Sequence, residues 1–443
     1  MFNYNLNISN HFFLFLTLSL VYVLPSNAQE QKEFNNLNEV LLLAKEKNYV
    51  FQNAAIQTKL ANLTKKTAIG NVINPRIPSS MQLIDNTKQQ VLFLPGDIFG
   101  QPGTFRQVTT GQKYSALINL QPQFDLFNLA SISQLKSAKI NQQITENEQK
   151  INEQNIYNQI NAIYFNILSF KGQIEIIRKN LAAADTILTI TQNRFKENIG
   201  RKQNVNEAEV NVISLKDNLE QLQFNLKIQE ENLGLFFENS IYPMLTEKVW
   251  TYENSNGSLQ TNNTLQLENA KLQLQMMEQD IKIAKAQNWP TLSFISSLNW
   301  QNLSKDFFYG ANSNAFSYNY IGLKLSMDLP TTVTKLASIK NKQFQSNILK
   351  VKLEHSINET KTKNQTLLLD YEKAVNQLQN FKKIASLKED TYRKSFNQYK
   401  ENIISLDQLL IYYNHMLSAQ LNMVSALANI GFSKSKIDIN NKF

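Results

Sequence analysis

The sequence predicts a mainly α-helical protein with a small β part, in which one structural unit occurs twice. Three observations lead to this prediction: a recurring seven-residue motif, long apolar heptad repeats on both sides of each copy, and four segments in which apolar and polar residues alternate. The motif reads N-R-F-K-E-N-I at 193–199 and N-Q-Y-K-E-N-I at 397–403, with five of its seven positions identical. We expect each copy to be the tip of a helical hairpin.

Composition narrows the class of protein. The chain has 443 residues, a formal net charge of +9 and no cysteine, so disulfides, thiolate metal sites, a cysteine nucleophile and a lipidated cysteine are excluded. Lysines are spread through the sequence without a basic block or a basic stripe with interleaved aromatic residues, so nucleic acid is not an expected partner.

The N-terminus has the pattern of an export signal. Residues 12–23 form an apolar run of 12, and Ser-Asn-Ala at 26–28 is a small-x-small cleavage site, which makes Gln29 the expected first residue of the mature chain. Residues 1–28 contain no Lys or Arg, which is unusual for a signal peptide, and an uncleaved anchor is the alternative. After this segment no apolar run is long enough for a spanning helix.

The first copy of the unit changes its hydrophobic period along the chain. A helix is predicted over 37–68, and alternation over 114–125 predicts a strand whose partner is expected within 76–85. Proline and glycine mark 86–112 as a long loop. From about 130 to 199 the period is helical again, and a return helix follows the tip.

The second copy repeats this order. A helix over 265–287 precedes a strand over 291–300, a polar loop over 302–317 and a strand over 318–329. A long helix then runs over 333–402, and a second return helix follows. The predicted boundaries are a signal peptide (1–28), the first repeat (29–235), an equatorial linker (236–260), the second repeat (261–432) and a disordered tail (433–443).

The heptad register is clean enough to predict the helical core. Spacings of four and three residues alternate, as in a left-handed coiled coil. In the first long helix the apolar positions are Ile156, Ile160, Ile163, Ile167, Phe170, Ile174, Ile177, Leu181, Ala184 and Leu188. A filamentous coiled-coil dimer is the alternative, but it leaves the alternating segments unexplained.

Four stretches carry a resemblance to a known family: L-N-E-V-L-L-L-A-K-E-K-N at 37–48, A-K-A-Q-N-W-P-T-L-S-F at 284–294, and the two tips with the helices that leave them, at 194–209 and 399–410. In this order and spacing they resemble the TolC-like outer-membrane efflux protein family over nearly the whole mature chain. The resemblance implies a trimer. Each chain would give four transmembrane strands to one shared β-barrel and two long coiled-coil hairpins to an α-barrel in the periplasm.

One part of this picture also follows from the residues themselves. Four strands are too few to close a barrel, and open strand edges cannot lie in lipid, so oligomerisation is expected. The number three comes from the resemblance alone.

The resemblance implies that a periplasmic adaptor docks at the hairpin tips. In this family the tip turn usually has glycine, whereas this chain has Asn198 and Asn402, and asparagine is the next best residue for a left-handed turn. Charge pairing with the adaptor is expected at Arg201 and Lys202. The candidate docking residues are Lys196, Glu197, Asn198, Ile199, Arg201, Lys202, Lys400, Glu401, Asn402 and Ile403.

The resemblance also implies a constriction lined by acidic residues just after the tips. Asp407 matches such a position in the second hairpin, Asn204 is taken as its match in the first, and Leu410 stands where a further Asp is expected. A ring of Asp407 side chains favours cations. The alternative is an ordinary solvated aspartate at a helix start, stabilised by the helix dipole.

No pattern for enzyme chemistry is found, and no cofactor or metal is expected. His355 and His415 are isolated, His11 lies in the signal, and phosphate loops and nucleophile elbows are missing. Trp300, Tyr318 and Tyr320 suggest either a sugar-binding platform or, better, an aromatic girdle at the bilayer surface.

The expected function is that of a passive outer-membrane duct with a periplasmic extension, gated at its hairpin tips. Its expected partners are two further copies, outer-membrane lipid, a periplasmic adaptor and an inner-membrane pump, in a tripartite efflux or type I secretion system. The alternative is a non-conducting coiled-coil scaffold or adhesin of the cell envelope.

Overall fold

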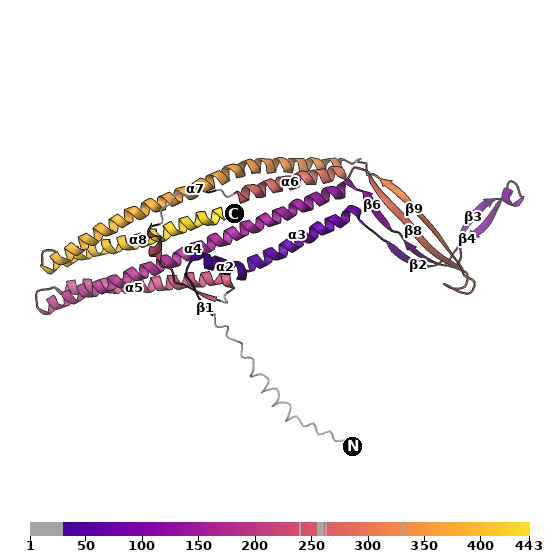
Figure 1. Ribbon diagram of the computed structural model, residues 1–443. Coiled ribbons are helices and arrows are strands. Elements are labelled where there is room, and N and C mark those ends of the chain that lie inside the picture. The colour runs from indigo at the N-terminus through magenta and orange to yellow at the C-terminus, as the bar shows by residue number, and fades with distance from the viewer. Residues whose placement is uncertain (1–29, 239–240, 255–260, 262–263, 330–331) are drawn as a thin grey trace, which may run out of the picture. The chain divides into compact units, whose positions relative to one another are not determined.

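A computed structural model describes residues 30–443 apart from 239–240, 255–260, 262–263 and 330–331 (Figure 1). The expected signal peptide lies outside the described residues. The chain divides into two units, a hairpin unit (1–53, 152–263 and 361–443) and a sheet unit (54–151 and 264–360). Most described residues are helical and a smaller part is strand, so the predicted fold class is confirmed.

The two long helices have equal length. Both α4 (Leu129–Lys196) and α7 (Val333–Lys400) have 68 residues, and their first residues lie 204 positions apart (333 − 129). The return helices α5 (Lys202–Gly234) and α8 (Leu406–Asn441) also begin 204 positions apart (406 − 202). The sequence distance that separates the two tip motifs therefore also separates the corresponding helices of the two hairpins.

The sheet unit contains one antiparallel sheet. Its strands are β2 (Ser79–Asp85), β5 (Tyr114–Leu120), β6 (Gln123–Phe127), β8 (Thr291–Ser304) and β9 (Asn314–Ser326). Because β5 and β6 pair with successive parts of β8 on the same side, they form one strand interrupted at Pro122. The sheet therefore has four strand positions, and among the described residues β2 and β9 each pair on one side only.

Helices of the sheet unit are held together by side-chain hydrogen bonds to backbone. Gln149 of α4 donates to the carbonyl oxygen of Ala54 in α3 (Tyr49–Ile73) at 2.7 Å. Asn147 of α4 donates to the carbonyl oxygen of Leu265 in α6 (Leu265–Ala286) at 3.0 Å. No helix among the described residues is long and apolar enough to cross a membrane.

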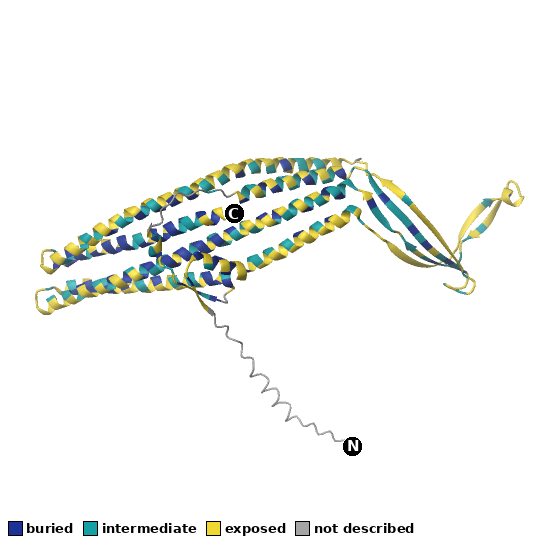
Figure 2. Ribbon diagram, viewed as in Figure 1, coloured by how far each residue is buried: buried dark blue, intermediate teal, exposed yellow. Residues whose placement is uncertain are grey.

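The hairpin unit buries five of the ten predicted heptad positions of α4 and partly buries the other five (Figure 2). Ile160, Ile167 and Ile177 are fully buried, whereas Phe170 and Leu188 are partly buried against the core. Over 156–170 the buried stripe is wider than a coiled-coil seam, because residues between the heptad positions are also enclosed by the strands and short helices packed around α4. These additional buried residues are Tyr157, Tyr164, Phe165 and Leu168.

One predicted helix is in fact two. The structure separates α2 (Leu37–Lys47) from α3 at Asn48, where a single helix was expected over 37–68. Asn48 is extended and buried, and its side-chain oxygen accepts a hydrogen bond from the backbone N–H of Val50 at 2.9 Å. This local bond ends one helix and begins the next, which a hydrophobic pattern does not reveal.

The prediction of a disordered tail over 433–443 is wrong, because α8 continues to Asn441. Ile437 and Ile439 are buried, and Asn440 donates to the side-chain oxygen of Asn364 in α7 at 3.2 Å. The polar composition of the tail suggested disorder, but its few apolar residues meet a core formed by distant parts of the chain.

Four short strands were not predicted. In the hairpin unit, β1 (Glu30–Phe34) pairs in parallel with β7 (Ile241–Leu245), which lies within the expected linker. In the loop 86–112, β3 (Gln90–Pro95) and β4 (Phe105–Thr110) form a hairpin. The segment between β3 and β4 requires Gly96, because a Cβ there would lie 2.1 Å from Oγ1 of Thr104.

Candidate functional site: the hairpin tips and the two-faced sheet

The two tips use the same backbone turn. Asn198 has φ of 59° and Asn402 has φ of 62°, so both asparagines are left-handed, as the sequence predicts for these positions. In the first tip the N–H of Ile199 donates to the carbonyl oxygen of Arg194 at 3.0 Å. In the second tip, the N–H of Ile403 donates to the carbonyl oxygen of Gln398 at 2.9 Å. These bonds satisfy carbonyl groups at the helix ends.

The candidate docking residues lie on the outside of both turns. Ile199 is 69% exposed and Ile403 is 64% exposed, so an apolar side chain projects from the same position of each tip. All the charged candidates are exposed as well: Lys196, Glu197, Arg201, Lys202, Lys400 and Glu401.

The candidate gate residues begin the return helices. Ser405 is the N-cap of α8 and accepts from the N–H of Gln408 at 3.3 Å, whereas the N-cap Arg201 of α5 has no such side-chain bond. Asp407 is exposed and is the second residue of its helix. Counted from the N-cap of each return helix, the counterpart of Asp407 in α5 is Gln203. The residue expected from the sequence, Asn204, lies one position further along the helix. Asn204 is the third residue of α5 and is half-buried.

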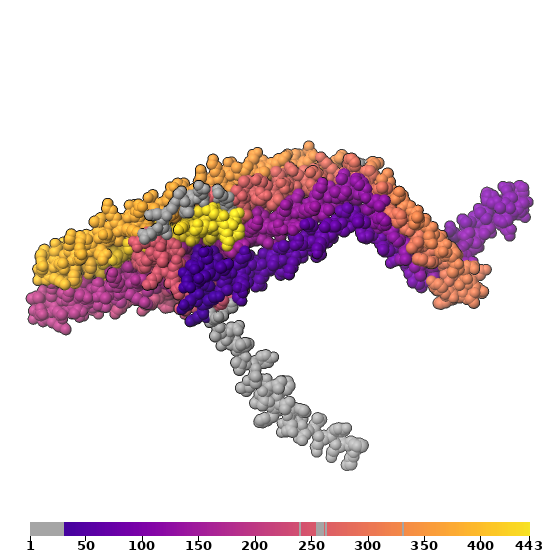
Figure 3. All heavy atoms as spheres, in the orientation of Figure 1, coloured from indigo at the N-terminus to yellow at the C-terminus, as the bar shows by residue number. Residues whose placement is uncertain are grey.

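One cation joins the two tips, which lie against each other in the space-filling view (Figure 3). The guanidinium of Arg194 donates to the carbonyl oxygens of Tyr399 at 2.8 Å and Lys400 at 3.1 Å. It also lies over the ring of Tyr399, 4.3 Å from the centroid, and the Tyr399 hydroxyl is 3.1 Å from Oγ1 of Thr191. Sequence reasoning did not single out Arg194.

A buried polar layer lies farther from the tips in the hairpin unit. Asn180 of α4 donates to the side-chain oxygen of Gln420 in α8 at 2.9 Å, and the hydroxyl of Tyr413 donates to the carbonyl oxygen of Asn180 at 2.8 Å. Burial raises the pKa of Tyr413, so its hydroxyl stays a donor at neutral pH. The layer borders a cavity of about 380 Å³ between α4, α7 and α8.

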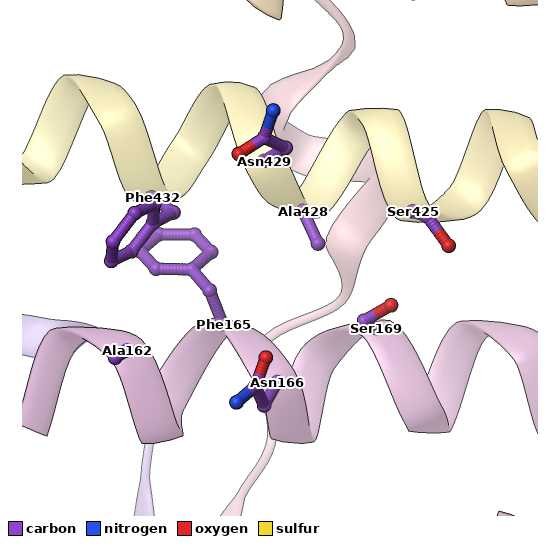
Figure 4. A pocket seen from close by; sticks show the side chains of 8 residues that line it. All are labelled: Ala162, Phe165, Asn166, Ser169, Ser425, Ala428, Asn429 and Phe432. Atoms are coloured by element: carbon purple, nitrogen blue, oxygen red, sulfur yellow. The ribbon is translucent and has the colours of Figure 1, made fainter. Parts of the chain in front are cut away.

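A second cavity, of about 390 Å³, lies between α4 and α8 (Figure 4). Its polar lining comes from Asn166 and Ser169 of α4 and from Ser425 and Asn429 of α8, while Phe165 and Phe432 close one end. The lining of the first cavity also includes the charged residues Lys179, Glu389 and Arg393. The described residues contain no group of three or more His, Cys, Asp and Glu that would hold a metal ion.

The sheet has one apolar and one polar face, because residues paired across antiparallel strands point to the same side. The apolar face is open to the surroundings: Ile321 is 76% exposed, Leu323 67% and Leu325 71%. By the register, other residues of this face are Met81, Leu83, Ile118, Phe124, Leu292, Phe294, Leu298 and Trp300.

The polar face is held by side-chain hydrogen bonds within and between the strands. Asn119 of β5 donates to Oγ of Ser297 in β8 at 3.3 Å, and Asn299 donates to the same oxygen at 2.9 Å. The hydroxyl of Ser293 donates to the Asp125 carboxylate at 2.8 Å. Tyr318 and Tyr320 belong to this face and Trp300 to the other, so these three do not form one aromatic cluster.

Comparisons with known proteins agree with this geometry. Residues 102–235 match the family model described as outer membrane efflux protein. The outer membrane protein VceC from Vibrio cholerae shares the fold, with a TM-score of 0.71 and 14% identity over 91% of this chain and 94% of that chain. The CmeC outer membrane channel of Campylobacter jejuni is similar, with a TM-score of 0.71 and 14% identity over 91% of this chain and 85% of that chain.

The open-state MtrE outer membrane channel of Neisseria gonorrhoeae is also similar, with a TM-score of 0.65 and 13% identity over 90% of this chain and 88% of that chain. No curated protein matches the sequence. The fold is thus one that outer membrane channels share. Together with the segment matched by the family model, it confirms the resemblance to the TolC-like outer-membrane efflux protein family.

Proposed function

We propose that the chain is one subunit of a passive duct through the outer membrane, gated at the hairpin tips. The two-faced sheet carries this proposal. Its apolar side chains are exposed in one chain, and its polar side chains already have partners on the opposite face. Lipid against one face and a water-filled lumen against the other would suit both sets.

Within the described part of the chain, the outer edges of β2 and β9 are unpaired, which supports a shared barrel. A strand edge in lipid leaves backbone N–H and C=O groups without partners, at a cost of several kcal/mol for each group, so membrane sheets must close. Pairing β2 of one copy with β9 of the next would close the sheet. Three copies is the number that the family resemblance implies.

The tips are the proposed gate and docking site. In a closed ring the Asp407 carboxylates would lie near one another and favour cations. A periplasmic adaptor would cover Ile199 and Ile403 and pair its charges with Arg201 and Lys202. An inner-membrane pump would supply the energy for exporting small molecules or a polypeptide, because the duct performs no chemistry itself.

Two measurements on the detergent-extracted protein test the duct. Electron-microscope projections should show a three-fold cylinder, and the protein in a planar lipid bilayer should conduct ions in discrete steps. A thin rod without a barrel and without conductance would support the scaffold or adhesin instead and contradict the proposal.

The docking site has a separate test. Reversing both charges with Arg201→Glu and Lys202→Glu should weaken binding of the adaptor. The matched control is Lys216→Glu with Lys227→Glu, which changes the charge of exposed lysines on the same helix by the same amount. If both double variants bind the adaptor equally well, the tip is not part of the docking site.

A further inference from the structure

We propose that the groove between α6 and the start of α7 binds the phosphate headgroup of an anionic membrane lipid. This inference rests on the proposed function, because it requires the sheet to lie in a membrane. The groove belongs to the sheet unit and has a volume of about 460 Å³. Lys282 and Lys285 line it from α6, and Lys340 and Lys350 line it from α7.

The positive charge of the groove is not compensated within the described part of the chain. All four lysines are exposed, and none forms an ion pair with another described residue. Glu278 is the only acidic residue among those that line the groove. The first twenty residues of α7, 333–352, contain five lysines and no Asp or Glu. Like charges that share one groove repel one another, so an external anion would stabilise the arrangement.

The groove also has an apolar part, which favours a lipid over a small inorganic anion. Phe344 lines it and is 57% exposed, and the Lys340 ammonium lies 5.6 Å from the centroid of its ring. Ile281 lines the α6 side. A cationic group beside exposed apolar surface is the combination that an amphiphilic anion contacts with both of its parts.

The position of the groove fits the depth of a headgroup. Lys285 is the second last residue of α6, and β8 begins only five residues after that helix ends, at Thr291. Trp289 lies in this junction and is 58% exposed, and tryptophan is enriched at membrane–water interfaces. Lys340 is the eighth residue of α7, about 10 Å from its start by helix rise. The sheet face that meets lipid and the lysines that meet phosphate are thus adjacent.

Trp289 provides a reporter for the test. The full chain carrying Trp250→Phe and Trp300→Phe keeps Trp289 as its sole tryptophan. This protein is placed in phosphatidylcholine nanodiscs that contain a small fraction of brominated phosphatidylglycerol or, in parallel, of brominated phosphatidylcholine. Stronger quenching by the brominated phosphatidylglycerol, reduced by added salt, is the expected result.

The variant is Lys282→Gln with Lys285→Gln and Lys340→Gln, and the matched control is Lys216→Gln with Lys227→Gln and Lys383→Gln, three exposed lysines of the hairpin unit. A lysine near an anionic membrane surface strengthens binding to that surface. Each neutralised groove lysine should therefore lower the preference for phosphatidylglycerol about fivefold. Lys350→Gln should have a smaller effect, because this residue lies farther along α7. The control should keep the preference of the parent.

Three results would overturn the inference. The first is equal quenching by the two brominated lipids, and the second is an unchanged preference in the groove variant. The third is release of the brominated lipid by inorganic phosphate at constant ionic strength, which would assign the groove to a free anion. Bilayer conductance of the same protein separates the two proposals. A conducting protein without the preference contradicts the lipid site alone, whereas a protein that does not enter the nanodisc contradicts both.

Discussion

Arg194 and Tyr399 occupy the two positions at which the tip motifs differ, and they contact each other in the structure. The first tip has Arg194 and Phe195 where the second has Gln398 and Tyr399. The Arg194 guanidinium donates to the backbone carbonyl of Tyr399 at 2.8 Å and lies over its ring. Arg194, which has no arginine counterpart in the second tip, thus contacts the residue at the other divergent position.

In the proposed duct, this contact should hold the two tips together. Arg194→Ala removes two charge-assisted hydrogen bonds and the stacking, and such bonds contribute about 1.5–3 kcal/mol each. We expect a higher open probability in bilayer recordings and faster hydrogen exchange at the end of α7. The control is Gln398→Ala at the matching position, which should leave both measurements unchanged. Equal behaviour of the two variants would show that the contact does not affect the gate.

The left-handed turns predict a clear difference between two substitutions. Asn198→Gly should be tolerated, because glycine adopts a φ of 59° without strain. Asn198→Val should destabilise the tip by roughly 1–2 kcal/mol, because a β-branched side chain is strained there. Asn193→Val, inside α4, serves as control, since asparagine and valine have similar helix propensities. Thermal unfolding of the three variants measures the difference, and a tolerated Asn198→Val would contradict it.

Asp407 and Gln203 test the register of the gate. Asp407→Asn should lower the cation preference, measured as the reversal potential in a salt gradient, because it removes one charge from each copy. Gln203→Asp should raise the preference, and Asn204→Asp should raise it less, because Asn204 is half-buried and lies one residue further along α5.

The other interpretation of Asp407 gives a different result. An aspartate that only stabilises the start of α8 contributes about 0.3–1 kcal/mol through the helix dipole. In that case Asp407→Asn would lower thermal stability slightly and leave the reversal potential where it was.

The end of α8 should be part of the cooperative fold. Ile437 is fully buried, so Ile437→Ala is expected to lower the free energy of unfolding by about 2–4 kcal/mol. Ile411→Ala on the same helix is the control, because Ile411 is 52% exposed and its truncation leaves no cavity. Chemical denaturation of the detergent-extracted protein gives both values. Similar values for the two variants would mean that the tail does not pack against the core.

The sequence by itself determined the helical hairpins, their tips and the four alternating segments. These features depend on local periodicity: the heptad positions such as Ile160 and Ile177 are buried, and Asn198 and Asn402 adopt the turn that their side chains tolerate. The segments expected within 76–85 and over 114–125 pair with each other, because the alternation that defines a strand also defines its buried face.

Only the tertiary structure decided the features that depend on distant contacts. The tail is helical because Ile437 meets a core built from other parts of the chain, and β1 pairs with β7 through backbone groups that carry no sequence signal. The contact of Arg194 with Tyr399 and the groove lined by Lys285 and Lys340 also join residues far apart in sequence. Periodicity fixes which face of an element is apolar, whereas only folding fixes which other residues that face meets.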